Sequence, residues 1–239
     1  MSRSYGDAGE LSAIYRDTPA APLRDEPQVI RVDTSTGEII EAERRPPADV
    51  SSLRLIGRLD DLYLLFQSNT DLLVIDQHTA HERVLYEETL ARMESHSGVG
   101  QSLLLPVQVE LGAEQVALFL ESREVLNQTG FAVEHFGGST VRIEAVPAIL
   151  SRKSPEIAIR AILDDLASLR KSGHDLKKAV AQSVACRSAV MAGDKLSDRE
   201  AIAVVERLLA CDNRYSCPHG RPTFIKVSRR DLDKQFGRV

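Results

Sequence analysis

The 239-residue sequence predicts an α+β fold, with strands concentrated early in the chain and helices later. Two observations support this fold class. Short apolar runs separated by turn residues occupy 53–75, which is typical of an antiparallel strand meander. Longer segments with helix-capping residues at the start and glycine after the end occupy much of 113–211. A hydrophobic fraction of 43% is sufficient for a substantial core.

The elements follow in order from turn, cap and glycine signals. We expect strands at 53–59, 62–67, 71–75, 131–136, 140–146 and 223–227, and helices at 77–93, 113–128, 155–171, 175–192, 197–211 and at the C-terminal end. Ser154 followed by Pro155 is a favourable helix start, because serine caps the helix and proline suits its first position. Ser197 with Glu200 three residues later forms a capping box. Residues 1–50 hold five of the ten prolines and little apolar periodicity, so we expect a disordered linker there.

Potential metal ligands gather in two short segments that lie far apart in the chain. Asp76, His78 and Glu82 follow directly on the apolar strand 72–75, and Cys217 and His219 stand two residues apart in a turn. His78 and Glu82 are four residues apart, so on a helix they share one face and can bind one ion, while Asp76 occupies the N-cap position. Each residue alone is an ordinary capping or surface group. Together they predict a metal site.

Bringing the two segments together requires a particular domain organisation. We expect 51–239 to form one domain, in which 51–105 and 176–239 make a subdomain with a mixed sheet and helices. The intervening 106–175 would then form a smaller α/β subdomain inserted at its outside. Two other zinc classes are excluded by spacing: the histidine pair matches neither HExxH nor HxxEH, and the Cys-x-x-Cys of nucleobase deaminases is absent from the sequence.

Charge and cysteine content narrow the class of protein further. The formal net charge of −5 argues against strong autonomous DNA binding, although 214–239 carries seven basic residues against two acidic ones. No apolar stretch is long enough to span a membrane and the start of the sequence has no signal-peptide apolar region, so we expect a cytoplasmic protein. Three cysteines make a disulfide framework improbable in that compartment and favour thiolate ligation or burial.

Four ordered motifs resemble one known family. The segment 76–87 resembles the DQHA(x)2E(x)4E motif of the C-terminal domain of MutL, the DNA mismatch repair protein, in its nicking-endonuclease form. Residues 185–187 resemble its ACR motif, 217–222 its C(P/N)HGRP motif and 236–238 its FxR motif. Thr79 departs from the pattern, which has alanine there. The resemblance covers 53–239 and implies that an ATPase half would precede the linker, so we expect a C-terminal fragment on which ATP acts only through that half.

The resemblance and the residue chemistry together define the expected site. Cys186, Cys217, His219, His78 and Glu82 combine thiolate, imidazole and carboxylate groups, which suit Zn²⁺, and Asp76 adds a sixth ligand that favours a second ion. The resemblance implies a structural or regulatory zinc and nicking supported by Mn²⁺, with Mg²⁺ a further candidate. We assign catalysis to Asp76 and Glu82.

Three further residues have supporting roles in this expectation. Glu87 is nine residues beyond His78, about half a turn away around the helix, so it is expected to form a salt bridge and not a metal bond. Arg187 and Arg221 either orient phosphate or pair with the metal-binding carboxylates.

A separate signal lies at Gln101, Leu103, Leu104 and Pro106. By composition alone, three consecutive leucines at 103–105 indicate a short buried strand. The resemblance instead implies a glutamine-led segment that docks into the sliding clamp of the replication machinery, where a glutamine and apolar anchors fill a pocket. It also implies a homodimer, weak DNA binding by the fragment, location at the nucleoid, and contact with a mismatch-recognition protein through the full-length chain.

Three functions therefore remain open: a metal-dependent DNA nicking endonuclease, a dimerisation module with a structural zinc site, and a clamp-binding adaptor without chemistry. The retained carboxylates Asp76 and Glu82 favour the endonuclease, because a structural zinc site needs only four ligands.

Overall fold

A computed structural model describes residues 29–32, 39–43, 53–95, 97–190 and 194–238. The chain divides into two compact units, one made of 1–84 and 190–239 and the other of 85–189. The first boundary falls inside the helix 77–94, and the second follows the helix that ends at Ser188. The expected insert, 106–175, lies within the second unit, which starts earlier and ends later. Within the expected linker, strands β1 (Val29–Val32) and β2 (Ile39–Glu43) form an antiparallel pair, and the rest of 1–50 lies outside the described residues.

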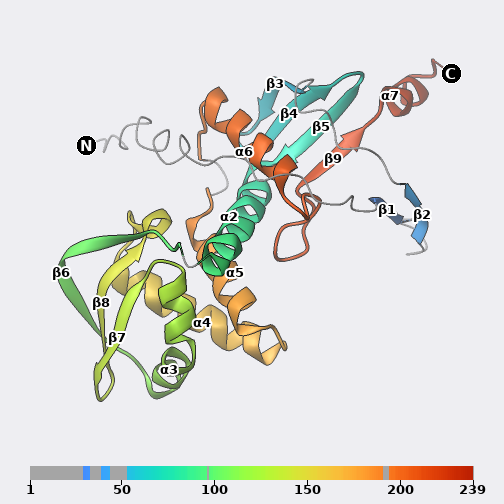
Figure 1. Cartoon of the computed structure of the whole chain (residues 1–239). Helices are drawn as coiled ribbons and strands as arrows, with labels where there is room; N and C mark the ends of the chain where they lie inside the picture. Colours follow the sequence, from blue (N-terminus) through green and yellow to red (C-terminus); the bar gives the residue numbers. More distant parts are fainter. Residues whose placement is uncertain (1–28, 33–38, 44–52, 96, 191–193, 239) are drawn as a thin grey trace. The chain divides into compact units, whose positions relative to one another are not determined.

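The first unit is built on a four-stranded sheet in the order β3-β4-β5-β9 (Figure 1). Its strands are β3 (Leu53–Leu59), β4 (Tyr63–Ser68), β5 (Asp71–Asp76) and β9 (Phe224–Val227), close to the predicted ranges. Two tight hairpins join the first three strands, and their turn residues Asp60, Asp61 and Asn69 take positive φ angles, as such turns require. Since β9 also runs antiparallel to β5, this sheet is antiparallel and the expectation of a mixed sheet is wrong.

One face of this sheet forms the core of the first unit. Leu64, Phe66, Leu73 and Ile75 are buried and alternate with less buried neighbours, as the two-residue period of a strand dictates. They belong to a cluster with apolar side chains of helix α6 (Asp198–Ala210), which Figure 1 shows beside the sheet. Helix α7 (Arg229–Gln235) follows β9 at the C-terminal end.

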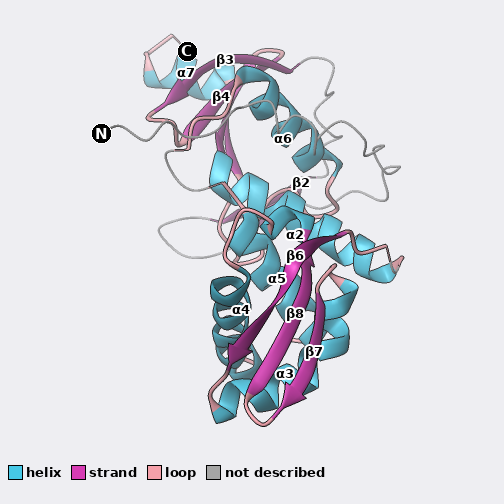
Figure 2. Cartoon of the chain, turned by 90° about the vertical axis from the view of Figure 1, so that its left-hand side faces the viewer, coloured by secondary structure: helices cyan, strands magenta, loops and turns pink. Residues whose placement is uncertain are grey.

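The second unit packs helices on a three-stranded antiparallel sheet in the order β6-β8-β7 (Figure 2). The strands are β6 (Gly100–Glu110), β7 (Ala132–Gly137) and β8 (Thr140–Pro147), and the helices are α3 (Ala113–Gln128), α4 (Pro155–Lys171), α5 (Leu176–Ser188) and the short η2 (Ala148–Leu150). Buried side chains of α3, α4, α5 and the sheet, including Phe119, Ile159 and Ile143, form one core. The α+β class is therefore confirmed.

The helix starts agree with the predicted positions, although the Ser154 side chain makes no capping hydrogen bond at α4. Pro155 opens α4, the Asp175 side chain accepts a hydrogen bond from the Lys178 backbone N–H at α5, and Ser197 and Glu200 form the expected capping box at α6. Among the residues that the structure describes, no helix combines the length and apolar composition that crossing a membrane requires.

The end of α5 was predicted incorrectly. The sequence favoured a helix to residue 192, whereas α5 ends at Ser188 and Ala189 is extended with ψ of 150°. The physical reason lies at Val190, whose backbone C=O and N–H both bond to histidine side chains of the helix after β5. A continuing α5 would need the Val190 N–H for its own ladder.

Candidate metal centre

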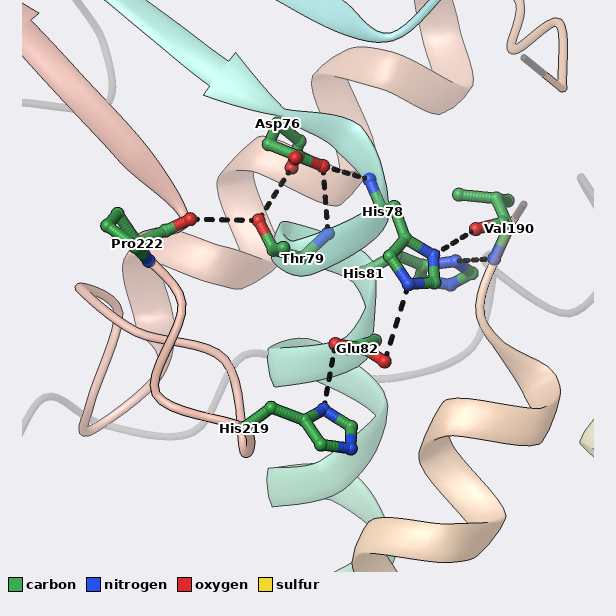
Figure 3. Close-up of polar contacts among 8 residues, drawn as sticks. All are labelled: Asp76, His78, Thr79, His81, Glu82, Val190, His219 and Pro222. Carbon is green, nitrogen blue, oxygen red and sulfur yellow. Dashed lines mark hydrogen bonds and ion pairs between the residues drawn. The ribbon is translucent and has the colours of Figure 1, made fainter. Parts of the chain in front are cut away.

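The centre begins where β5 runs into helix α2 (Gln77–Glu94). The carboxylate of Asp76 caps this helix, because its Oδ1 accepts hydrogen bonds from the backbone N–H of His78 at 2.9 Å and of Thr79 at 3.0 Å. Figure 3 shows Asp76 at the start of the helix with these two bonds. The cap fixes the first turn of α2, so His78 and Glu82 project from a defined helix face.

The Glu82 carboxylate lies between two imidazoles (Figure 3). Its Oε1 is 3.4 Å from His78 Nε2, and its Oε2 is 3.4 Å from His219 Nδ1. The side chain of Glu82 is only 4% exposed. A buried carboxylate is costly unless a cation or hydrogen-bond donors compensate its charge, and here imidazoles from two separate chain segments approach it.

The tautomer of His78 determines what can lie between His78 and Glu82. His78 Nδ1 is 2.7 Å from the carbonyl oxygen of Val190, which only accepts, so Nδ1 carries the hydrogen. In the neutral ring, Nε2 then presents a lone pair toward Glu82 Oε1, which is also an acceptor. Two acceptors facing each other need a proton or a metal ion between them. A backbone carbonyl that fixes the tautomer of a histidine in this way is the usual support of a metal-binding imidazole.

His81 bonds to the other backbone group of Val190. Its Nδ1 accepts the Val190 backbone N–H at 3.1 Å. Burial, the nearby Arg207 charge and His78 together lower the pKa of His81 to about 3. The ring therefore stays neutral and able to accept this bond. His78 and His81 thus hold the backbone of Val190 at the residue where the chain returns to the first unit.

The second ligand segment is a tight loop from Ser216 to Pro222. Backbone bonds from Cys217 N–H to Arg221 O at 2.8 Å and from Gly220 N–H to Cys217 O at 2.9 Å close it, and Gly220 takes φ of 80°. Cys217 is buried and His219 is exposed at the loop tip. Burial raises the pKa of the Cys217 thiol, the backbone N–H groups of the loop oppose this, and the neighbouring Glu82 raises it further.

The donor types at Glu82 are ones that zinc accepts. At zinc bond lengths of about 2.0–2.2 Å to nitrogen and oxygen, two ligands of a tetrahedral ion stand about 3.4 Å apart. Each imidazole–carboxylate separation at Glu82 has this value, with Oε1 toward His78 and Oε2 toward His219. With Cys217 beside Glu82, the side chains offer imidazole nitrogen, carboxylate oxygen and sulfur, donor types that zinc accepts and Mg²⁺ does not favour.

The remaining expected site residues are Cys186, Arg187, Glu87 and Arg221. Cys186 is half-buried near the end of α5, in the second unit. Arg187 forms a two-point ion pair with Asp165 of α4, with contacts of 2.6 and 3.0 Å, so its carboxylate partner is neither Asp76 nor Glu82. Glu87 is half-buried on α2 within the second unit, and Arg221 is exposed on the Ser216–Pro222 loop.

The segment expected to contact the clamp lies on β6, at the edge of its sheet. The pairs with β8 stop at Ser102 and resume at Val107, so the four residues between them leave the ladder. Leu103 packs on the core, whereas Leu104 is fully exposed and Leu105 is 78% exposed. The interpretation of 103–105 as a buried strand is therefore wrong for Leu104 and Leu105.

Three supporting contacts could not be predicted. The Val190 peptide, the Ser216 carbonyl and the Pro222 carbonyl bond to side chains of α2, at His78, Arg83 and Thr79. Each partner is a backbone group more than 100 residues away. Backbone groups occur at every position, so no residue pattern marks them.

The first unit thus combines an antiparallel sheet with a capped helix whose His78 and Glu82 approach a cysteine–histidine loop, and the chain is an α+β protein with potential metal ligands gathered at Glu82. Comparison with known proteins identifies its family. The model of the MutL C-terminal dimerisation domain matches residues 56–196, more than half of the chain, and the chain belongs to this family.

The individual proteins that are similar in sequence to this chain are named as members of the same family. A DNA mismatch repair protein MutL from Clostridium botulinum (strain Loch Maree / Type A3) is 36% identical over 208 residues, which is 87% of this chain and 31% of the relative. The MutL proteins of Prosthecochloris aestuarii and Methanothrix thermoacetophila are 35% and 33% identical over 98% and 95% of this chain, and 37% and 41% of their own lengths. The chain thus spans about a third of the relatives it matches.

Proposed function

We propose that this chain acts in DNA mismatch repair as a metal-dependent nicking endonuclease and dimerisation domain. The observation that carries the proposal is the buried Glu82 carboxylate, which faces the lone pair of His78 Nε2 on one side and His219 on the other. A metal ion is one group that satisfies both acceptors, and the resembled motif attaches DNA nicking to these residues. The relatives named as DNA mismatch repair proteins support the pathway.

The proposed ligands divide by chemical type. His78, Glu82, Cys217 and His219 suit Zn²⁺, and Cys186 supplies a second thiolate as the resembled ACR motif implies. Asp76 adds a hard anionic oxygen suited to Mn²⁺ or Mg²⁺. One oxygen of its carboxylate already caps α2, which leaves the other for this role.

Bound ions would supply a nucleophilic water near neutral pH and a counter-charge for the phosphate oxygens. The chain's own residues prepare that chemistry. The Val190 carbonyl keeps the hydrogen of His78 on Nδ1, so Nε2 is free to bind. Burial keeps water from competing for Glu82. In the full-length protein, ATP would act through the preceding half, and the full-length chain would contact the mismatch-recognition protein.

A plasmid assay tests the proposal. We expect the purified chain to contain zinc and to convert supercoiled plasmid to open circles slowly in Mn²⁺, and chelation to abolish this. A chain that binds zinc but never nicks, even when joined to its ATPase half, would favour the dimerisation module with a structural zinc site. A chain without zinc or nicking would favour the clamp-binding adaptor.

We propose the outer face of the first sheet as the surface that pairs two copies of the chain. Leu65, Val74 and Ile225 stand side by side on three neighbouring strands, on the face opposite the core. Ile225 is 56% exposed. An apolar row across a sheet face is the kind of surface that dimers bury, and the family model is named for dimerisation.

Ile225→Asp should weaken the dimer by at least about 30-fold, because a charge buried at an interface core without a partner costs about 2 kcal/mol or more. Sedimentation at micromolar concentration measures the change. Ile157→Asp, at an exposed isoleucine of α4, is the matched control and should leave the dimer intact. A dimer that tolerates Ile225→Asp and is lost with Ile157→Asp would place the interface in the second unit.

We also propose that 101–106 docks into a sliding clamp. An edge strand that leaves its ladder presents both backbone and side chains to a partner, and here Gln101, Leu104 and Pro106 are exposed while Leu103 anchors the segment to the core. A clamp encircling DNA would raise the local concentration of a weak, acidic nuclease on its substrate.

The combined change Gln101→Ala and Leu104→Ala should reduce clamp affinity by at least about 30-fold, as expected when hot-spot side chains are truncated. Calorimetry with purified clamp measures this. Leu120→Ala, at a leucine of α3 that is also exposed, should bind as the parent does. Equal binding by the double variant would refute this docking site.

A further inference from the structure

We propose that Thr79 and Arg83 are positioning residues that fix the Ser216–Pro222 loop against α2, and so set the distance from Cys217 and His219 to Glu82. The two residues are four apart on α2 and therefore share one face of the helix. The inference rests on the proposed metal centre and adds two residues that do not themselves bind the metal.

Each residue holds one stem of the loop. The Thr79 hydroxyl donates to the Pro222 carbonyl at 3.1 Å, a bond visible in Figure 3, and Arg83 Nε donates to the Ser216 carbonyl at 2.5 Å. Ser216 and Pro222 face each other in an antiparallel bridge, so they are the two ends of the loop. Thr79 and Arg83 are both buried, which makes these bonds stronger than they would be in water.

The loop carries Cys217 and His219, and hydrogen bonds within the loop cannot fix the position of these two residues relative to α2. Its internal bonds, from Cys217 to Arg221 and from Gly220 to Cys217, fix only its shape. The position of that shape relative to Glu82 depends on contacts with the helix. Pro222 has no N–H, so its carbonyl is its one backbone hydrogen-bonding group, and Thr79 engages it.

The Thr79 hydroxyl is not required to cap the helix. The Asp76 carboxylate already accepts the N–H groups of His78 and Thr79. The Thr79 hydroxyl also lies 3.3 Å from the Asp76 carbonyl, but it has one hydrogen to donate and the Pro222 carbonyl is the nearer acceptor. Removing the hydroxyl should therefore loosen the loop more than the helix.

The test measures zinc affinity and the absorption spectrum of bound Co²⁺ for the whole chain with Thr79→Val, Thr79→Ser and Thr89→Val. Thr79→Val keeps the shape but removes the donor, and we expect about tenfold weaker zinc binding, typical of a lost supporting bond, with an altered Co²⁺ spectrum. Thr79→Ser keeps the donor and should match the parent. Thr89→Val removes a buried hydroxyl of the same helix that donates to the Leu85 carbonyl, within the helix itself. This variant should have no effect.

The outcomes separate this inference from the proposed function. If the parent binds zinc and Thr79→Val matches it in affinity and spectrum, the positioning role is wrong and the metal centre stands. If the parent binds no zinc, the metal centre itself fails. Should Thr79→Val not fold, Thr79→Ala takes its place: a folded alanine variant with parental affinity refutes the inference, and a weakened one that serine restores supports it. Arg83→Gln should weaken zinc binding in the same way, and parental affinity there would remove Arg83 from the proposal.

Discussion

Asp76→Asn should abolish Mn²⁺-dependent nicking while the chain stays folded and keeps its zinc. Asparagine offers the same Oδ1 acceptor that now receives the N–H groups of His78 and Thr79, so α2 remains capped. What disappears is the negative charge that we assign to the Mn²⁺ ion. We expect the rate of plasmid nicking to fall by at least about 100-fold, a loss common when a group that stabilises transition-state charge is removed.

The matched control is the same chemical change at another helix cap. Asp175 caps α5 through the Lys178 N–H, and Asp175→Asn should nick as the parent does. Zinc content and the thermal unfolding midpoint should stay near parental values in both variants. If Asp76→Asn nicks plasmid at the parental rate in a preparation free of contaminating nuclease, the catalytic assignment of Asp76 is wrong.

Glu82→Lys should remove both metal and activity. The substitution replaces a buried carboxylate between two imidazoles with an ammonium group, which occupies the place of the ion and repels it. We expect zinc content, measured by atomic emission on the purified chain, to fall from about one per chain to near zero, and nicking to fall below detection.

Two further variants separate loss of metal from loss of fold. Glu82→Gln keeps the size of the side chain without its charge, and should fold yet bind zinc about 100-fold more weakly, the upper end for a disturbed metal site. Glu94→Lys, at an exposed glutamate near the end of the same helix, should change neither property. A Glu82→Gln chain with parental zinc affinity would exclude Glu82 from the ligand set.

Local signals predicted most of the helices and strands. Caps such as Ser197 with Glu200 act within four residues, so the sequence shows both partners at once. The end of α5 was missed because the groups that stop it, His78 and His81, lie more than 100 residues away and bond to a backbone peptide. An antiparallel sheet was likewise not distinguished from a mixed one, since the direction of β9 beside β5 depends on a long-range return of the chain.

The candidate site also combines local features, which the sequence predicts, with long-range features, which it does not. The spacing of His78 and Glu82 on one helix is a local property and was predicted, as was the pairing of ligand types with Cys217 and His219. Which oxygen of Glu82 faces which imidazole depends on tertiary structure. The hydrogen bond from Thr79 to the Pro222 carbonyl also depends on tertiary structure, because the sequence does not show whether a buried threonine has a distant partner.

The central claim is that Glu82 shares a metal ion with histidine and cysteine side chains. X-ray diffraction from zinc-loaded crystals, with anomalous differences collected above and below the zinc edge, tests it most directly. We predict a peak within about 2.0–2.3 Å of a Glu82 carboxylate oxygen, an imidazole nitrogen of His78 or His219, and Cys217 Sγ. Zinc-loaded crystals with no anomalous peak at Glu82, or with zinc bound only to surface residues away from the Ser216–Pro222 loop, would contradict the claim.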